Sequence, residues 1–266
     1  MMYGPEKIES LLTTKWAGRT ITFYEETDST NIQAVKEAEN GASHGTLLVA
    51  DRQTAGRGRR GRGWESPAGT NIYFTLILKP DFAPDRASML TLVMAHSVNR
   101  AIRQETGLAC GIKWPNDIVV NGRKVCGILT EMKVVQGRIC HVIIGAGINV
   151  GKQEFAAELS EKATCLDREC DGKVSRSSLL ARIMKAFEED YGTFVERGNL
   201  RGLLESYNQV LVNRNAGVRV LDPQGEYEGK ALGITETGEL LVETLTGEIV
   251  EVYAGEVSVR GIYGYI

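Results

Sequence analysis

The 266-residue sequence lacks the features that would place a protein in a membrane or on nucleic acid. It has no run of about 20 apolar residues, the length that a helix needs to cross a bilayer. Its first residues do not have the layout of a secretion signal. The formal net charge is −3, whereas general nucleic-acid binders are usually basic. We therefore expect a cytoplasmic protein with no membrane or DNA partner.

Cysteine and histidine are scarce and scattered. Five cysteines without regular spacing favour free thiols in a reducing compartment over a disulfide framework. Cys165 and Cys170 are the nearest pair, but no second pair or histidine cluster completes a zinc site. The histidines His44, His96 and His141 lie far apart in the sequence, and no Ser-His-Asp set is visible. His96 falls in a helical pattern, so we expect a structural role for it.

What the sequence does contain is a core-forming composition that changes character near Val212. Hydrophobic residues make up 42% and charged residues 24%, which allows one large domain, or a large and a small one. After about Asn213, helical spacing stops, and short β-type runs alternate with turns at intervals of roughly ten residues. We predict an α+β domain over 1–212, with mainly antiparallel hairpins, and a small β-barrel domain over 213–266.

Periodicity predicts the individual elements of the first part. The expected helices span 29–40, 87–105, 178–195 and 200–211. The expected strands span 46–50, 70–78, 112–114, 117–120, 124–132 and 139–144. Ser29 or Thr30 can cap the first helix, and Asn121-Gly122 predicts a tight hairpin turn.

The segment from Gly56 to Gly63, named here the Gly–Arg loop, holds four arginines and four glycines within eight residues. Glycines let backbone amides approach an anion, and arginines supply fixed forks of donors. The literal G-x-G-x-x-G match is not a dinucleotide motif, because Pro67 and Gly69 follow where a helix should begin. Phosphate binding by arginines and amides is our interpretation; a solvated loop and an RNA-binding patch are the alternatives.

Residues 113–117, Lys-Trp-Pro-Asn-Asp, form the second informative segment. Alternation puts Lys113 and Trp114 on opposite faces, so one can reach a pocket and the other the core. We expect Lys113 to be partly buried, and a buried ammonium group requires an anion. Spacing alone leaves open whether that anion is a substrate carboxylate or the side chain of Asp117 or Glu131.

Five segments occur in one order along the chain, namely 26–31, 53–64, 113–117, 127–129 and 145–149. Together they resemble the biotin–protein ligase family, also called biotin–[acetyl-CoA-carboxylase] ligases. The resemblance is strong over 26–150 and weaker through 255–260. It implies a catalytic domain similar to class II aminoacyl-tRNA synthetases, followed by an SH3-like barrel. Only 25 residues precede the first segment, so we expect the ligase-only form without an N-terminal DNA-binding domain.

The resemblance also implies substrates, cofactor and partners. Biotin and ATP would react to biotinyl-5′-AMP, with Mg²⁺ expected alongside ATP, and a lysine of a biotin carboxyl carrier protein would then accept biotin. Family analogy suggests a homodimer through the strand after Arg138. The alternatives are a lipoate or other acyl ligase on the same scaffold, and a non-enzymatic nucleic-acid binder. The first lacks the expected signature, and the acidic balance argues against the second.

Residue roles follow from the same resemblance. Lys113, Arg57 and Arg59 would be catalytic, with Lys113 on the biotin carboxylate and the arginines offsetting the repulsion between two anions. The predicted biotin site comprises Ser29, Thr30, Asn31, Gln53, Arg57, Gly58, Arg59, Trp64, Lys113, Gly145 and Gly147. The predicted nucleotide site comprises Arg59, Arg62, Asn149 and Arg260. The metal ligands are unknown, apart from a hint at Asn149.

Several of these residues also have a plainer interpretation. Ser29, Thr30, Gln53 and the Arg57 amide would hold the ureido group, but the first two could merely cap a helix. Trp64 would pack along the valeryl chain, or it could be a core aromatic. Gly145 and Gly147 would let the biotin ring lie against the backbone. Asn149 could be a turn residue.

Overall fold

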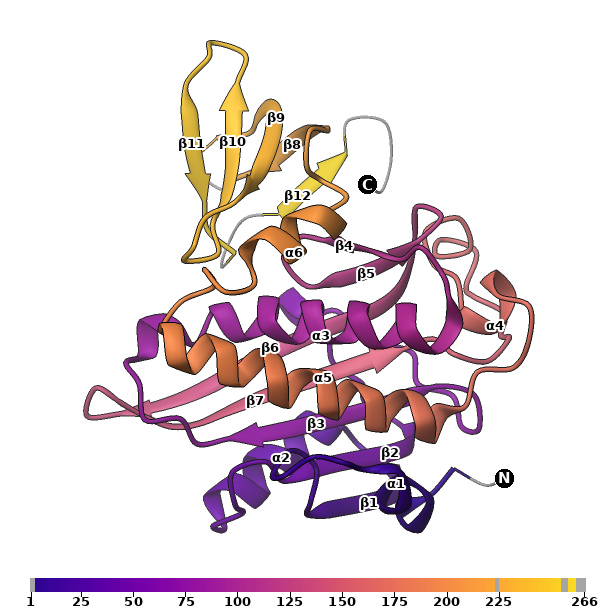
Figure 1. Ribbon diagram of the computed structural model, residues 1–266. Helices are drawn as coiled ribbons and strands as arrows, with labels where there is room; N and C mark the ends of the chain where they lie inside the picture. The colour runs from indigo at the N-terminus through magenta and orange to yellow at the C-terminus, as the bar shows by residue number, and fades with distance from the viewer. Residues whose placement is uncertain (1–2, 223–224, 255–257, 262–266) are drawn as a thin grey trace.

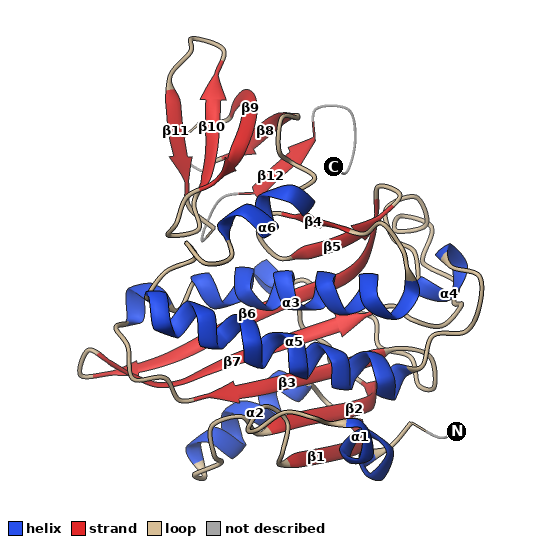
Figure 2. Cartoon of the chain, viewed as in Figure 1, coloured by secondary structure: helices blue, strands red, loops and turns tan. Residues whose placement is uncertain are grey.

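The computed structural model describes residues 3–222, 225–254 and 258–261 (Figure 1). A seven-stranded sheet with its helices precedes a separate five-stranded sheet, as Figure 2 shows. This confirms a mixed helix-and-sheet part followed by a β part. The predicted boundary near Val212 falls between the two sheets and stays a prediction. Residues 255–257 of the weak C-terminal resemblance, and 262–266 of the predicted barrel, lie outside the described residues.

The large sheet is antiparallel except for one pair, with strand order β1-β2-β3-β7-β6-β5-β4, in which β1 and β2 are parallel. Its strands are β1 (Ile21–Thr27), β2 (Leu47–Gln53), β3 (Ile72–Leu78), β4 (Gly111–Lys113), β5 (Asp117–Val120), β6 (Arg123–Val135) and β7 (Arg138–Ile148). β7 is longer than predicted, because Gly145 pairs with Leu129 of β6 and Thr75 of β3 instead of ending the strand.

The helices cover both faces of this sheet. They are α1 (Pro5–Leu11), α2 (Thr30–Glu39), α3 (Met89–Thr106), α4 (Leu166–Glu169), α5 (Arg176–Arg197) and α6 (Leu204–Val210), with 3-10 turns η1 (Arg59–Gly61) and η2 (Pro84–Arg86). α3 and α5 lie across one face (Figure 1), where their apolar sides join the main core. Ala34 and Ala38 of α2 pack on the other face against Leu48, Ile77 and Ile143. α6 is shorter than the predicted helix over 200–211.

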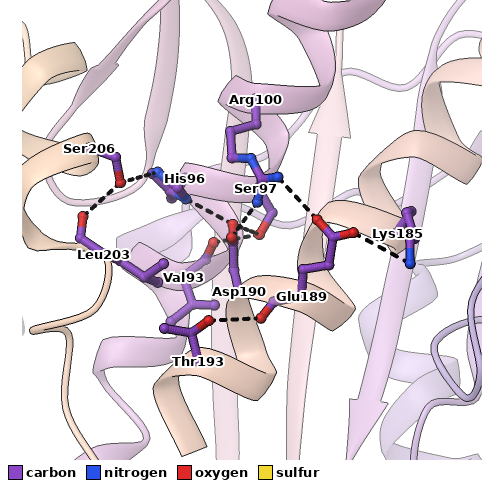
Figure 3. Close-up of polar contacts among 10 residues, drawn as sticks. All are labelled: Val93, His96, Ser97, Arg100, Lys185, Glu189, Asp190, Thr193, Leu203 and Ser206. Carbon is purple, nitrogen blue, oxygen red and sulfur yellow. Dashed lines mark hydrogen bonds and ion pairs between the residues drawn. The ribbon is translucent and has the colours of Figure 1, made fainter. Parts of the chain in front are cut away.

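A polar network that is buried at His96, Ser97 and Asp190 ties α3, α5 and α6 together (Figure 3). Asp190 accepts hydrogen bonds from Ser97 and Arg100 and lies 2.8 Å from His96 Nδ1. His96 Nε2 lies 2.9 Å from Ser206 Oγ. The sequence did not reveal this Ser-His-Asp arrangement, because its members are up to 110 residues apart. His96 and Asp190 are buried between the helices, with 4% and 3% of their surfaces exposed, so we assign the network to helix packing.

The small sheet has the antiparallel order β11-β10-β9-β8-β12. Its strands are β8 (Gly217–Leu221), β9 (Tyr227–Ile234), β10 (Leu240–Thr244), β11 (Ile249–Val252) and β12 (Ser258–Gly261). It docks on the first part through Trp114, whose indole Nε1 donates to the Gly238 carbonyl at 3.0 Å. Trp114 is 2% exposed, as predicted for one residue of the Lys113-Trp114 pair. Within the described ranges, no helix is long and apolar enough to span a membrane.

Candidate active site

Ten of the eleven predicted biotin-site residues line one cavity, formed by the N-terminus of α2, the Gly–Arg loop, and strands β2, β6 and β7. The wall comprises Ser29, Thr30, Asn31, Gln53, Arg57, Gly58, Arg59, Trp64, Phe74, Asn116, Lys124, Gly127, Ile128, Leu129, Gly145, Ala146 and Gly147. Lys113, Arg62, Asn149 and Arg260 are outside this wall. Phe74, Asn116 and Lys124 were not among the predicted site residues.

The polar part of the wall is held in place by its own hydrogen bonds. Gln53 Oε1 accepts from the Thr30 amide at 2.8 Å and from its hydroxyl at 3.1 Å, while Gln53 Nε2 donates to Ser66 at 2.9 Å. Ser29 occupies the N-cap of α2, but its side chain makes no capping bond. The interpretation of Ser29 as a simple cap is therefore wrong. Instead, the Gln53 side chain accepts a terminal amide of α2.

Two glycines of β7 make room for side chains of the wall. A Cβ at Gly145 would lie 1.9 Å from Asn31 Oδ1, and one at Gly147 would lie 2.3 Å from Trp64 Nε1. A larger residue at either strand position would have to displace a side chain of the wall. Direct contact of these glycines with a biotin ring stays a prediction. Trp64 is only partly buried and lines the cavity, and its Nε1 has no hydrogen-bond partner among the described residues.

The Gly–Arg loop forms a narrow hairpin at the cavity. Arg57 bridges to Gly63, and the Gly58 amide donates to the Arg62 carbonyl at 2.7 Å. A Cβ at Gly56 would lie 2.3 Å from the Trp64 carbonyl, so the two ends of the loop approach as closely as glycine allows. The loop thus has defined main-chain contacts between its two sides.

The arginines of the loop point to different partners. Arg57 forms an ion pair with Glu131, Nη2 to Oε1 at 2.9 Å. Arg59 donates to Asn116 Oδ1 at 3.0 Å and to the carbonyl of Ala254 in the C-terminal part, and burial lowers the pKa of its guanidinium. Arg62 is exposed. The arginines were predicted as one anion-binding set, but the structure gives each a separate environment.

Lys113 is buried beside the cavity, with 6% of its surface exposed, more deeply than expected. Burial lowers its pKa to about 8; the charges of Lys124 and Arg260 also lower it, and that of Asp117 opposes them. Of the two carboxylates proposed as partners from the sequence, Asp117 is the one whose charge acts on Lys113. Glu131 instead contacts Arg57.

Lys124 is the lysine that reaches the cavity wall. Its Nζ lies 2.6 Å from Asp117 Oδ1 and 5.2 Å from the centroid of the Trp64 ring. Lys124 was not among the site residues predicted from the sequence. The predicted Asn121-Gly122 turn was a signal for it, because that turn folds Lys124 back beside β5. Lys124 thus brings a positive charge to the cavity wall, where a carboxylate and an aromatic face hold it in place.

The predicted nucleotide residues are spread around the cavity. Asn149 is 4% exposed and donates from Nδ2 to the Thr164 carbonyl at 3.2 Å, which is a contact within the fold. Arg260 lies exposed on β12, close enough for its charge to act on Lys113. No cluster of three or more His, Cys, Asp or Glu among the described residues could hold a metal ion.

Sequence profiles of two protein domains match the chain. The biotin/lipoate A/B protein ligase family matches residues 23–149, and the biotin protein ligase C-terminal domain matches residues 215–260. The bifunctional ligase/repressor BirA of Bacillus subtilis is 40% identical over 250 residues, covering 92% of this chain and 76% of that protein. The biotin–[acetyl-CoA-carboxylase] ligase of Mycobacterium tuberculosis is 30% identical over 246 residues, covering 90% and 88%.

Solved structures agree with these matches. The biotin protein ligase from Aquifex aeolicus in complex with biotin and ATP superimposes with a TM-score of 0.80 at 32% identity, covering 91% of this chain and 99% of that one. The chain belongs to the biotin/lipoate A/B protein ligase family. Because the C-terminal match, the Mycobacterium tuberculosis relative and the Aquifex aeolicus structure are all named as biotin ligases, it belongs to the biotin protein ligases within that family.

Proposed function

We infer that the chain is an ATP-dependent biotin–protein ligase. It forms biotinyl-5′-AMP and transfers biotin to a lysine of a biotin carboxyl carrier protein. The observation that carries this conclusion is the cavity under the Gly–Arg loop, which brings together ten of the eleven residues predicted for biotin. No observation favours lipoate, and the similar Aquifex aeolicus structure is a complex with biotin and ATP.

We propose that the ureido group of biotin lies at the N-terminus of α2. Ser29, Thr30, Gln53 and the Arg57 amide supply donors and acceptors there, within a wall that also contains Phe74. A small number of fixed polar groups in an apolar wall is the usual design of a site for such a ligand. Trp64 is proposed to lie along the valeryl chain, which its place in the wall supports.

The carboxylate of biotin is proposed to lie near Lys124, with Lys113 behind it. In the first step a carboxylate oxygen attacks the α-phosphorus of ATP, and pyrophosphate leaves. Two anions must approach each other, so fixed positive charge in a partly dehydrated site lowers the barrier. The ion pair of Lys124 with Asp117 at 2.6 Å supports a defined position for that charge. In the second step the carrier lysine attacks the mixed anhydride and AMP leaves.

ATP is proposed to bind beside this point, with Arg59 and Arg62 of the loop, Asn149 and Arg260 of β12 around it. The charge of Arg260 lowers the pKa of Lys113, which supports the placement of Arg260 near the nucleotide. Mg²⁺ is proposed to arrive on the ATP phosphates, because magnesium usually keeps several waters and needs few protein ligands. Asn149 could supply one oxygen ligand. When bound, the ion would neutralise phosphate charge.

The structural class of each part and the oligomeric state of the protein are proposals as well. The large sheet with its helices is proposed to be related to class II aminoacyl-tRNA synthetases, and the small antiparallel sheet to an SH3-like barrel. A homodimer is proposed through β7, the strand that begins at Arg138, together with its neighbour β6. Its support is the exposure of Met132, Val134 and Val135, whose exposed fractions are 48%, 39% and 47%.

The direct test is biotin-dependent exchange of labelled pyrophosphate into ATP by the purified chain. A ligase of this type incorporates label only when biotin and magnesium are present, and it then biotinylates an added carrier domain. Equal concentrations of lipoate serve as the comparison. Absence of any biotinyl-5′-AMP under these conditions would refute the proposed function.

A further inference from the structure

Glu131 lies where the Gly–Arg loop meets the wall of the cavity, and the reaction steps above give it no role. Its carboxylate contacts the Arg57 guanidinium twice, with Nη2 to Oε1 at 2.9 Å and Nη1 to Oε2 at 3.3 Å. The same Oε2 accepts a hydrogen bond from Asn31 Nδ2 at 2.9 Å. One carboxylate on β6 thus connects the loop with the first turn of α2.

The connection continues around the cavity. Asn31 Oδ1 accepts from the Thr75 hydroxyl at 2.7 Å, and Thr75 Oγ1 lies 2.8 Å from Thr30 Oγ1. Gln53 then links Thr30 to Ser66, and Ser66 donates to the Trp64 carbonyl at 3.0 Å. The contacts run from Arg57, at the start of the loop, to Trp64, just after its end, by way of Glu131, Asn31, Thr75, Thr30, Gln53 and Ser66.

Burial and charge indicate what Glu131 contributes. Asn31 is 5% exposed, so its amide donors need acceptors within the protein; Glu131 supplies the nearer one at 2.9 Å, and the Leu129 carbonyl lies at 3.5 Å. A carboxylate beside a site for anionic substrates would repel them unless a cation neutralises it. Arg57 provides that cation, so its guanidinium is already paired and its backbone amide remains for the ligand. Glu131 therefore couples the position of the Gly–Arg loop, through Arg57, to the orientation of Asn31 in the cavity wall.

We propose that Glu131 is a positioning residue of the biotin site, which holds the Gly–Arg loop closed through Arg57 and orients Asn31 in the cavity wall. This inference rests on the proposed function for its kinetic consequences. Its two contacts are separable by substitution. Glu131→Gln keeps an oxygen for Asn31 but loses the charge and one acceptor for Arg57, whereas Glu131→Ala loses both contacts.

Kinetics of the full-length chain separate the two contacts. For Glu131→Gln we expect biotinyl-5′-AMP to dissociate about two- to fivefold faster, the range of a partly exposed ion pair, with the KM for biotin unchanged within about twofold. For Glu131→Ala we expect the same faster release and, in addition, a KM for biotin raised on the order of tenfold, because the Asn31 amide keeps only the longer bond to the Leu129 carbonyl, at 3.5 Å. If Glu131 were only structural, both variants would lower thermal stability, and the KM for biotin would not distinguish Glu131→Ala from Glu131→Gln.

Tryptic cleavage of the loop tests the contact without any substrate. The loop has four arginines, so freeing it from Glu131 should raise the rate of cleavage between Arg57 and Arg62 in both variants. Glu39→Gln is the matched control, because it breaks an exposed ion pair, 2.6 Å long, between Glu39 at the end of α2 and Lys133 of β6, the strand that carries Glu131. That control should leave both cleavage and kinetics at wild-type values.

The inference is overturned if Glu131→Ala matches the Glu39→Gln control in tryptic cleavage, adenylate release and KM for biotin. It is also overturned if both Glu131 variants change thermal stability alone. If the wild-type chain forms no adenylate, the proposed function fails by itself, while the cleavage rates still decide whether Glu131 holds the loop.

Discussion

Replacing Lys124 with glutamine removes the ammonium group that we place at the biotin carboxylate and leaves most of the side chain. In the structure Lys124 is 24% exposed, and its Nζ lies 2.6 Å from Asp117 Oδ1. The variant loses a charge-assisted contact to biotin and leaves the Asp117 carboxylate, 14% exposed, without this partner. A hydrogen bond to a charged group contributes about 1.5–3 kcal/mol, so kcat/KM for biotin should fall roughly 10- to 150-fold.

Pyrophosphate exchange over a range of biotin concentrations measures that ratio, and calorimetry with biotin alone measures binding. Lys162→Gln is the control, because Lys162 is exposed and contacts Lys124 only through its main-chain carbonyl. Lys113→Gln distinguishes the two lysines: if biotin binding falls there and stays normal in Lys124→Gln, Lys113 contacts the carboxylate and our assignment is refuted.

Three further outcomes are expected. Arg59→Gly should release biotinyl-5′-AMP faster, because it loses the bonds to Asn116 and to the C-terminal part; unchanged release in a stopped-flow experiment would contradict this. Trp64→Ala should raise the KM for biotin while preserving the melting temperature, since Trp64 lines the cavity at Gly147. Burial lowers the pKa of Lys113 to about 8, below the 10.5 of an unperturbed lysine. Between these pH values the unfolded chain binds more protons than the folded chain, so the free energy of unfolding should rise with pH. In Lys113→Met, urea unfolding should show a smaller rise over the same pH range.

The sequence by itself located many of the secondary elements, although not α1, β1 or α4, and it determined the chemistry of the loop. Strand alternation, helical spacing and turn residues are local properties, so the strands over 112–120, the helix over 87–105 and the β-rich C-terminal part could be located. The Gly–Arg loop was recognisable because its composition, flanked by apolar strands, is itself the signal. The order of the five segments pointed to the family for the same reason, since each segment is short and contiguous.

Only the tertiary structure decided which lysine reaches the cavity. Strict alternation would place Lys124 and Gly127 on opposite faces of β6. The pairing of β5 with β6 shifts register between Ile118 and Val119, which leaves one extra residue on β6. The bulge places Lys124 on the same face of β6 as Gly127. A Cβ added at Gly127 would lie 2.9 Å from Lys124 Nζ. A bulge arises from long-range pairing, so local periodicity cannot reveal it.

Long-range contacts also decided the partners of the charged groups. Glu131 was a conceivable partner for Lys113 by spacing, but the fold brings it to Arg57, 74 residues away in the sequence, and to Asn31, 100 residues away. The Ser206–His96–Asp190 network has the same origin, because it exists only once three helices pack together. Composition and local pattern specify which groups are available, whereas pairing and burial in the folded chain specify which of them meet and how strongly they interact.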